Sequence, residues 1–433
     1  MLFENFSSAW AMLLGSSFLL AVILGLVVQK TNFCTMGAVS DWVNIGDKGR
    51  IRAWMLAIAV ALLGVTIFET QGLITPDLAF PPYRSGTLIW AENMLGGFLF
   101  GVGMTYGSGC GNKTLIRIGG GNLKSVMVFL LIGVIAYFML NAMPGTDQTL
   151  FSLLFNDWIR PLAITFDSGA QDFGTIVAGP ENAASGRLWV GLALSLAMFI
   201  FIFKSADFRS NFNNILGGLV VGLVIIGAWY VTSSIRLDYE SDFDGEVKTT
   251  LREYLDPTTS QWEMAEDVHA GWEGPKPSRN SGSPMSFTFI NPLGQTVGYI
   301  FTGMQKTKIT FGVAIVFGVI LGSLLWTLLK KGFRIEWFSS VRDFFNHLIG
   351  GILMGFGGVL ALGCTFGQGI TGVSTLALGS YLALISIVFG SALTMKVQYY
   401  KMVYEDAGFF AALASSLVDL RLLPSMMRKL EKV

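Results

Sequence analysis

The sequence is short of charged residues. Only 13% of its 433 residues are Asp, Glu, Lys or Arg, which is about half of the share in an ordinary soluble domain. Hydrophobic residues make up 52%, and there are 52 glycines, which suits helices that pack closely in lipid. The composition therefore excludes a typical soluble domain and predicts an all-α integral membrane protein.

Cysteine and histidine are also rare. The chain has three cysteines (Cys34, Cys110 and Cys364), none in a Cys-x-x-Cys pair, and two histidines. These are too few, and too far apart, for a zinc site or a dithiol redox centre. The sequence shows no Walker motif and no basic patch for nucleic acid. It predicts no catalytic residues, no metal, no cofactor and no nucleic-acid partner.

Apolar segments recur along the whole chain. A helix of about 20 residues crosses a ~30 Å hydrocarbon core, and about nine transmembrane helices are predicted, over residues 10–29, 53–69, 93–108, 125–143, 188–203, 214–234, 309–329, 347–361 and 372–395. Residues 407–423 are flanked by bases and are expected to form an interfacial helix. Residues 31–46 and 287–303 would have to enter and leave on one side, so both are predicted to be re-entrant segments.

Lys and Arg are unevenly divided between alternate loops. Of the 29 bases, 19 fall on the side of the C-terminus, whereas 20 of the 29 acids fall on the other side. Positive loops favour the cytoplasm. The bias predicts that the N-terminus lies outside and the C-terminus inside.

Part of the sequence is repeated. Residues 93–111 match residues 347–365 at seven of nineteen positions, Cys110 falling on Cys364. The segment around Cys34 then corresponds to the segment around Phe289. The loop after the second span is acidic, but its counterpart after the seventh span is basic, so the two halves must be inverted repeats. Inverted repeats with broken helices near the midplane are typical of transporters.

These patterns divide the chain into five parts. Residues 1–204 form a first transmembrane half, and residues 205–235 the first helix of the second half. Residues 236–286 form an acidic extracytoplasmic insertion that is partly loop-like. Residues 287–400 form the rest of the second half, and residues 401–433 an interfacial C-terminal segment.

The cysteines fall where irregular backbone is expected. Cys110 and Cys364 lie in Gly-Ser-Gly-Cys-Gly-Asn-Lys and Leu-Gly-Cys-Thr-Phe-Gly-Gln-Gly. Helix N-termini and free backbone N–H groups stabilise anions, and a thiol is a weak, polarisable donor. We expect a pathway for a small sulfur-containing anion, formed by Cys34, Cys110, Cys364, Ser108, Asn112, Thr365 and Gln368. Lys113 is expected to attract the anion, although it could instead be an interfacial lysine, and the thiols could simply be packed.

At these motifs the chain resembles the YeeE/YedE family of sulfur transport proteins, over most of its length except residues 236–290 and the extreme C-terminus. The resemblance implies uptake of thiosulfate, or a related anion, across a bacterial inner membrane through a pseudo-symmetric, hourglass-like fold. It implies S–H hydrogen bonds from cysteines to the cargo, and a cytoplasmic sulfur carrier of the TusA type as a partner. It also implies a cysteine in the second re-entrant segment, where this chain has Phe289-Ile290-Asn291-Pro292.

Three alternatives stay open. The cargo could be a selenium compound, since other members of the family are linked to selenium metabolism. The protein could be a membrane-embedded sulfur-transfer protein that carries a persulfide, which needs a thiolate beside a cation such as Lys113. The insertion could dock a partner within a larger complex.

Overall fold

The computed structural model describes residues 1–241 and 245–431. Residues 242–244 of the expected insertion and 432–433 of the expected interfacial segment lie outside this range. Within it, eight helices are long and apolar enough to cross a membrane, and they include α1 (Phe6–Thr31), α3 (Gly49–Thr70), α6 (Leu123–Leu140), α9 (Ala183–Phe203), α11 (Phe212–Ser234), α15 (Phe311–Leu329), α16 (Val341–Leu360) and α17 (Leu378–Val403). Helix α4 (Trp90–Tyr106) has 17 residues, the lower limit for a span. The predicted all-α multi-pass fold is confirmed.

Short helical elements interrupt this bundle. Both expected re-entrant segments contain one, α2 (Thr35–Ser40) and α14 (Ile290–Phe301). Three further elements follow the cysteine motifs: α5 (Gly111–Gly119) after Cys110, and the π-helical turn η9 (Gly367–Gly372) and the 3-10 turn η10 (Val373–Thr375) after Cys364. The remaining helices are α7 (Asp157–Ile159), α8 (Phe173–Ala178), α10 (Ala206–Ser210), α12 (Leu251–Tyr254), α13 (Gln261–Met264) and α18 (Phe409–Asp419).

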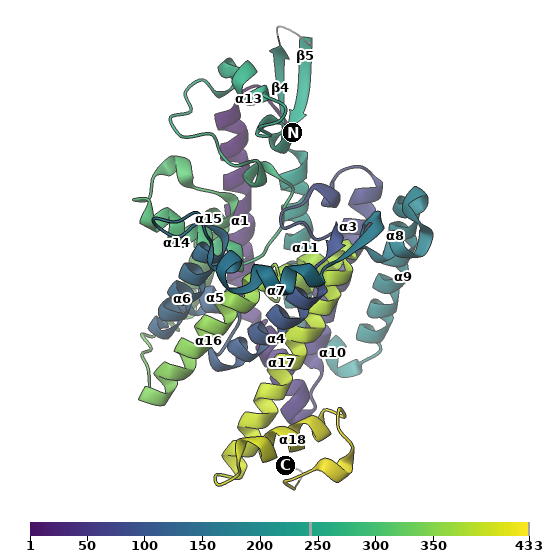
Figure 1. Ribbon diagram of the computed structural model, residues 1–433, viewed down its shortest axis with the longest axis vertical. Coiled ribbons are helices and arrows are strands. Elements are labelled where there is room, and N and C mark those ends of the chain that lie inside the picture. The colour runs from purple at the N-terminus through teal and green to yellow at the C-terminus, as the bar shows by residue number, and fades with distance from the viewer. Residues whose placement is uncertain (242–244, 432–433) are drawn as a thin grey trace.

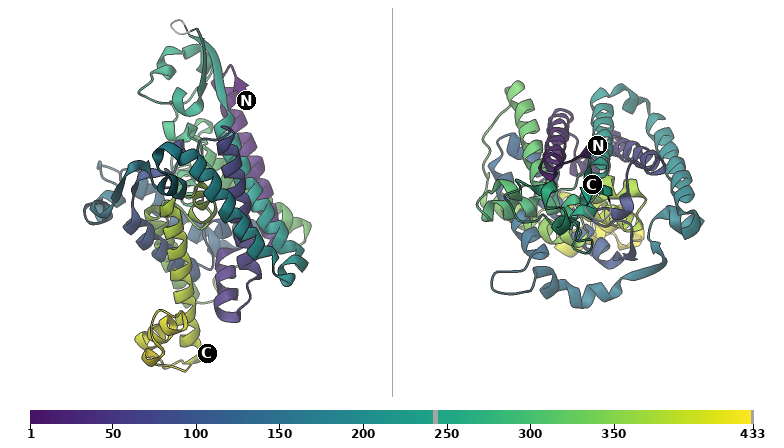
Figure 2. Two further views of the ribbon diagram at one scale, coloured as in Figure 1. Left: turned by 90° about the vertical axis from the view of Figure 1, so that its right-hand side faces the viewer. Right: turned by 90° about the horizontal axis from the view of Figure 1, so that it is seen from above.

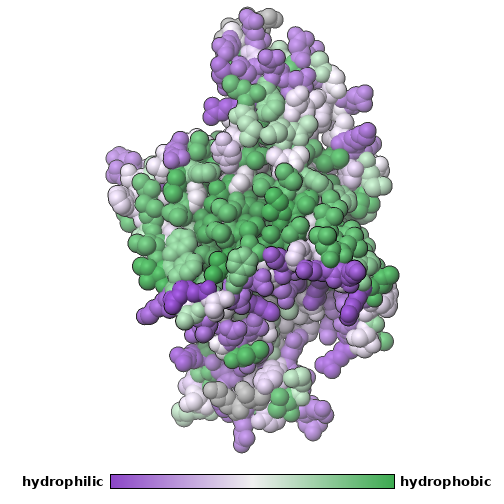
Figure 3. All heavy atoms as spheres, turned by 180° about the vertical axis from the view of Figure 1, so that it is seen from behind, coloured by the Kyte–Doolittle hydropathy of each residue, from purple (hydrophilic) through white to green (hydrophobic). Residues whose placement is uncertain are grey.

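The two ends of the bundle differ. Figure 1 shows the insertion and the N-terminus at one end and the C-terminal helix α18 at the other. We call the first end the insertion face and the second the C-terminal face. A belt of hydrophobic residues surrounds the middle of the molecule on the side seen in Figure 3, with hydrophilic residues above and below it. This distribution is what a bilayer requires of a spanning bundle.

The helices exchange partners between the halves. Helix α1 packs on α15, and its counterpart in the repeat, α11, packs on α3. Helix α4 packs on α17, while its counterpart α16 packs on α6, and α4 and α16 also contact each other. Helix α9 falls outside this scheme and lies at the edge of the bundle against α3 (Figure 2). The reciprocal pairing shows that the two halves are intertwined repeats.

The glycine-rich helices α4 and α16 end in the same way. The residue just beyond each helix cap, Ser108 or Leu362, has a left-handed backbone with φ of 58°. In α4 the backbone N–H of Gly107 donates to the carbonyl of Gly103, and that of Gly109 to the carbonyl of Met104. In α16, 254 residues later, Ala361 donates to Gly357 and Gly363 to Gly358 in the same way, and all four bonds are 2.8 to 2.9 Å long. This Schellman arrangement stops the helix. It places Cys110 and Cys364 at equivalent points, two residues after the left-handed residue.

Glycine allows α4 and α17 to approach closely. A methyl group at Gly101 would lie 2.8 Å from the backbone nitrogen of Ser391 and would overlap the carbonyl of Ile387. At Gly15 of α1 a methyl group would meet nothing within 4 Å. The same substitution should therefore destabilise the protein at Gly101 and be tolerated at Gly15.

We expect Gly101→Val to lower the free energy of unfolding by about 3 kcal/mol or more, because backbone cannot move aside as a flexible side chain can. Gly15→Val, which carries the same propensity penalty in a helix, serves as the matched control and should be tolerated. The measurement is the thermal midpoint and the monodisperse fraction after extraction in detergent. Equal midpoints for the two variants would contradict the close packing.

The insertion is a folded module. Strands β4 (Arg236–Ser241) and β5 (Gly245–Thr250) pair in antiparallel fashion, and β1 (Leu2–Phe3) adds to β4 in parallel. The second small sheet of the protein, β2 (Ser85–Leu88) with β3 (Ile164–Ala170), joins two loops of the insertion face. The module packs on α1, since the rings of Trp262 and Trp272 meet Phe6 edge-on at 5.1 and 5.2 Å.

Candidate functional site

All three cysteines lie inside the bundle at the start of a short helical element. Cys34 is the N-cap of α2, and Cys110 is the N-cap of α5. The carbonyl of Cys364 accepts a hydrogen bond from the backbone N–H of Gln368 at 2.8 Å, as the carbonyl of Cys110 does from Thr114 at 2.9 Å. The three cysteines are free thiols, 7%, 2% and 0% exposed respectively. All three are therefore buried at breaks of the backbone, and the breaks at Cys110 and Cys364 are equivalent in the repeat.

The position equivalent to Cys34 in the second half is held by Phe289. It is the N-cap of α14, as Cys34 is of α2, and it is fully buried. Its backbone N–H faces the sulfur of Cys364, and a methyl group at Gly111, the first residue of α5, would lie 3.4 Å from its Cβ. The thiol of Cys110 is close enough to those of Cys34 and Cys364 to interact electrostatically with both. The N-terminal ends of four short elements therefore converge in the middle of the bundle.

Aromatic rings surround this convergence point. Phe33 stacks on Trp54 with ring centroids 5.7 Å apart. The ring of Phe366 meets both of them edge-on at 6.1 Å and meets Phe289 at 5.6 Å. Phe33 and Phe366 lie one and two residues from a cysteine in the sequence, and the backbone N–H of Phe289 faces the sulfur of Cys364. The rings exclude water from the thiols while leaving polarisable surfaces around them.

Several polar groups beside the cysteines are buried without a hydrogen-bond partner among the described residues. They are the Thr35 hydroxyl, the Asn112 side-chain oxygen, the Gln368 side-chain oxygen and the Trp54 indole N–H. Each such group costs about 1–3 kcal/mol when it stays unpaired. A cluster of them is therefore typical of a site whose guest supplies the missing bonds. Thr365, also buried, lies with its hydroxyl beside the Cys110 thiol.

A basic cavity of about 560 Å³ leads from the C-terminal face towards this centre. Ser108 and Lys113 line it, and the ammonium of Lys113 donates a hydrogen bond of 2.7 Å to the side-chain oxygen of Asn32. Its lining includes four bases and two acids: Lys113, Arg117, Lys124, Arg334, Glu336 and Asp343. The structure thus places Lys113 in a mouth that favours anions, beside the Cys110 motif.

Smaller cavities approach from the insertion face. One, of about 130 Å³, is lined by Tyr83, Gln368 and Leu362, and a second, of about 100 Å³, by Leu362 and Gly363. Ser108 and Leu362 are equivalent in the repeat, yet they line cavities on opposite faces. The two halves are therefore inverted, and the buried cysteines lie between the two sets of cavities.

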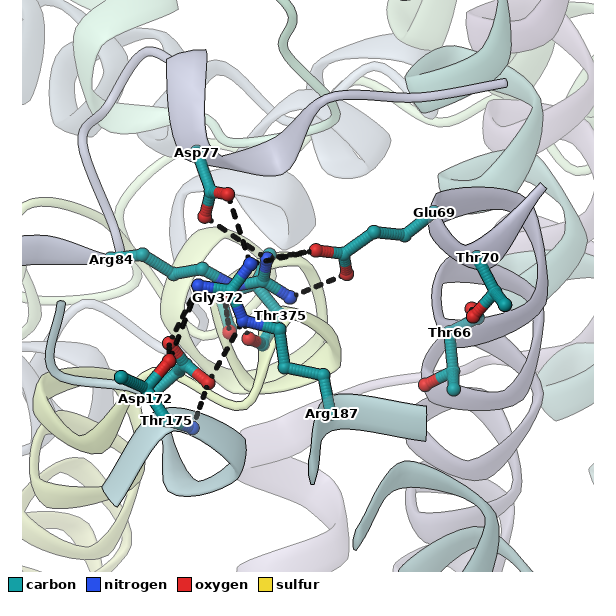
Figure 4. Close-up of polar contacts among 10 residues, drawn as sticks. All are labelled: Thr66, Glu69, Thr70, Asp77, Arg84, Asp172, Thr175, Arg187, Gly372 and Thr375. Atoms are coloured by element: carbon teal, nitrogen blue, oxygen red, sulfur yellow. Dashed lines mark hydrogen bonds and ion pairs between the residues drawn. The ribbon is translucent and has the colours of Figure 1, made fainter. Parts of the chain in front are cut away.

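The sequence gives no direct sign of an ionic cluster that supports the insertion-face end of η10 (Figure 4). Arg84 is 4% exposed, donates to the carbonyl of Thr375 at 2.6 Å and holds both carboxylate oxygens of Glu69. Arg187 of α9 holds both oxygens of Asp172 at 3.0 Å. A cation at the C-terminal end of a helical turn satisfies carbonyls that lack partners. The cluster ties α3 and α9 to the element that follows Cys364.

Asp172 is charged in this cluster. Burial acts to raise the pKa of Asp172, but the hydrogen bonds from Arg187 and Thr175 outweigh it and hold the pKa below its ordinary value.

In the sequence alone, Glu69 and Arg84 are only loop charges, because Arg187 and Thr375, which complete the cluster, lie far away along the chain. No group of three or more His, Cys, Asp and Glu side chains within residues 1–241 and 245–431 is arranged to hold a metal ion.

Comparison with known proteins gives two results. The chain matches the sequence profile of a family described as Sulphur transport, over residues 30–271 and 268–393. It is also similar to two proteins named thiosulfate transporter TsuA. The one from Escherichia coli (strain K12) is 21% identical over 381 residues, which cover 87% of this chain and 92% of the relative. The one from Spirochaeta thermophila is 23% identical over 378 residues, which cover 86% and 95%.

Proposed function

The chain belongs to the sulphur transport family, and from this premise we propose that it takes up thiosulfate, or a closely related small sulfur anion, along its three cysteines. The observation that carries the proposal is the position of the thiols. They are buried at converging helix starts, between a basic cavity on one face and smaller cavities on the other. Both relatives reported above are named for thiosulfate transport.

The anion passes the cysteines in an order set by their neighbours. Gly363, beside Cys364, lines a cavity of the insertion face, whereas Ser108 and Asn32 line the basic cavity. Cys364 therefore receives the anion first, and Cys110 and Cys34 pass it towards Lys113. Each thiol donates an S–H hydrogen bond to the terminal sulfur of thiosulfate and keeps its proton, so no covalent bond forms or breaks. Weak binding at several successive points allows an ion to leave as readily as it enters.

The electrostatics of the centre suit an anion without a fixed counter-charge. Backbone N–H groups of Phe289, Phe366 and Gly367 face the sulfur of Cys364, and the starts of α5 and α14 carry the positive ends of their helix dipoles. A full cation in their place would hold the anion and stop its passage. The unpartnered Thr35 hydroxyl and Trp54 indole N–H can donate hydrogen bonds, and they replace part of the lost hydration.

We further propose the direction and the setting of this transport. The insertion face lies outside a bacterial inner membrane and the C-terminal face inside, because 19 of the 29 bases belong to the C-terminal side. The basic cavity then releases the anion to the cytoplasm, where a TusA-like sulfur carrier is a fitting acceptor. Tagging each terminus and testing its accessibility in intact spheroplasts checks the orientation. A cytoplasmic N-terminus would reverse it.

The function is tested by uptake of labelled thiosulfate into proteoliposomes, and by growth on thiosulfate of a host that cannot take up sulfate. We expect both to depend on the wild-type chain. Absence of uptake by well-folded wild-type protein would refute the function. Competition with selenosulfate tests the selenium alternative, because a selenium atom offers the same soft contact to a thiol.

The persulfide alternative requires a different arrangement. It needs a thiolate held by Lys113, but the ammonium of Lys113 is turned to Asn32 at 2.7 Å. Intact mass after exposure to a sulfur donor distinguishes the two mechanisms. A pathway of neutral thiols predicts no mass increase, whereas a persulfide adds one sulfur atom.

A further inference from the structure

A third cavity on the insertion face, of about 460 Å³, lies beneath residues 278–286, which form the end of the insertion. The first turns of α14 and α15 complete its wall. None of the described residues that line it is charged, and its polar groups are hydroxyls and amides, including Asn280, Ser281, Thr288, Asn291, Gln295 and Thr310. Such a lining suits a ligand that accepts many hydrogen bonds.

Thr288 indicates that this lining has an absent partner. The residue lines both this cavity and the one that reaches Gly363, it is only 6% exposed, and its buried hydroxyl is unpartnered among the described residues. Gln295 is oriented by Thr310, whose hydroxyl donates to the Gln295 side-chain oxygen at 2.5 Å. This bond leaves the Gln295 amide NH₂ free to donate. With two helix starts at the wall, the cavity offers donors and positive dipole ends, the requirements of an anion site.

The cavity is continuous with the route to Cys364. It shares Thr288, Asn291 and Pro81 with the cavity of about 100 Å³ that reaches Gly363. A methyl group at Gly363 would lie 3.4 Å from the Thr288 hydroxyl oxygen. An anion in the larger cavity is therefore one step away from the first thiol.

We infer that this cavity is a capture site for thiosulfate, built partly by the insertion and placed before the cysteines. The inference rests on the proposed function. Neutral donors bind the three oxygens of the anion, while Met285 and Phe311 in the same wall give its terminal sulfur a soft, apolar contact. Lys308, which lines the adjoining pocket of about 210 Å³, supplies a positive potential without contacting the ligand directly.

The insertion is fixed in position for this role. The guanidinium of Arg252 donates to the carbonyl of Leu78 at 3.1 Å and to the hydroxyl of Ser283 at 2.7 Å. The backbone N–H of Phe80 donates to the carbonyl of Pro284 at 3.0 Å. Residues 278–286 are thus attached to the loop that follows α3, and the upper wall of the cavity is held in place.

The test is the kinetics of thiosulfate uptake by the full chain in proteoliposomes. Asn291→Asp places a negative charge in the cavity and should raise KM about tenfold or more, with Vmax within about twofold of the wild type. Thr288→Val removes one hydroxyl at nearly constant shape and should raise KM about threefold to tenfold. Asn182→Asp, the same change at an exposed position before α9 on the insertion face, is the control and should leave KM unchanged.

The outcomes separate the two proposals. If wild-type protein takes up no thiosulfate, the proposed function is wrong. If it does, and both cavity variants keep the wild-type KM, the capture site is wrong while the cysteine pathway stands. Should Asn291→Asp fail to yield monodisperse protein, Thr288→Val decides the question alone, because it removes no packing atom.

Discussion

Thiosulfate uptake should fall at least about a hundredfold in Cys364→Ala and in Cys110→Ala. Both residues are almost completely buried, at 0% and 2% exposure, between the basic cavity and the cavities of the insertion face. Alanine there removes the only S–H donor at that step and leaves an apolar wall, so the anion must lose hydration without replacement. Two successive missing contacts should make the double variant inactive.

The control must remove a similar buried group elsewhere. Ser195→Ala also removes one heavy atom from a buried side chain, 1% exposed, but on the peripheral helix α9. It should keep wild-type uptake. Cys34→Ala should have a smaller effect than the other two, because Cys34 is the most exposed of the three cysteines, at 7%. Wild-type rates in both Cys110→Ala and Cys364→Ala would eliminate the cysteine pathway.

Arg84→Met should destabilise the protein by about 3 kcal/mol, because it leaves the Thr375 carbonyl without a partner and takes from the Glu69 carboxylate one of its two arginine partners, the other being Arg187. Arg84 is 4% exposed and bonds to both groups. The variant should also transport slowly, since the broken helix after Cys364 loses its cap. The thermal midpoint in detergent, together with uptake per folded molecule, measures the two effects separately.

A second arginine provides the comparison. Arg279 of the insertion pairs with Asp256 at 2.9 Å, but its side chain is 42% exposed. Arg279→Met should therefore cost at most about 1 kcal/mol. If the two arginine variants lower the midpoint equally, the cluster in Figure 4 does not stabilise the bundle as described.

Local hydropathy was enough to predict most of the architecture. Each of the nine expected spans contains a helix, although the ninth begins at Leu378 of α17 and not at residue 372, and both expected re-entrant segments contain one. The repeat also predicted that Cys110 and Cys364 are equivalent, and the matching left-handed residues Ser108 and Leu362 confirm this. Segment length, glycine pattern and loop charge are all encoded within short stretches of sequence, which explains the success.

The features that escaped prediction depend on residues far apart in the chain. Arg84 meets Thr375 and Arg187 meets Asp77, and nothing near either arginine in the sequence identifies its partner. The packed core of the insertion likewise joins residues near Phe6 to residues near Trp262. Thr288 was not singled out, because a threonine gives no sign of being unpartnered until its surroundings are known.

The site residues divide in the same way. Cys34, Cys110, Cys364, Asn112, Thr365 and Gln368 are all buried near the centre, whereas Ser108 and Lys113 line the basic cavity. Phe289, where a cysteine was implied by resemblance, is an N-cap against the same centre. That these residues handle the cargo remains a prediction for the variants above.

The convergence of helix starts has a consequence for the energy of the cell. Protons, sodium and potassium on the proposed route would meet the positive ends of several helix dipoles beside the buried thiols. Such a barrier makes the pathway an insulator for cations. A membrane that contains many copies of the protein would then admit the anion without dissipating its ion gradients.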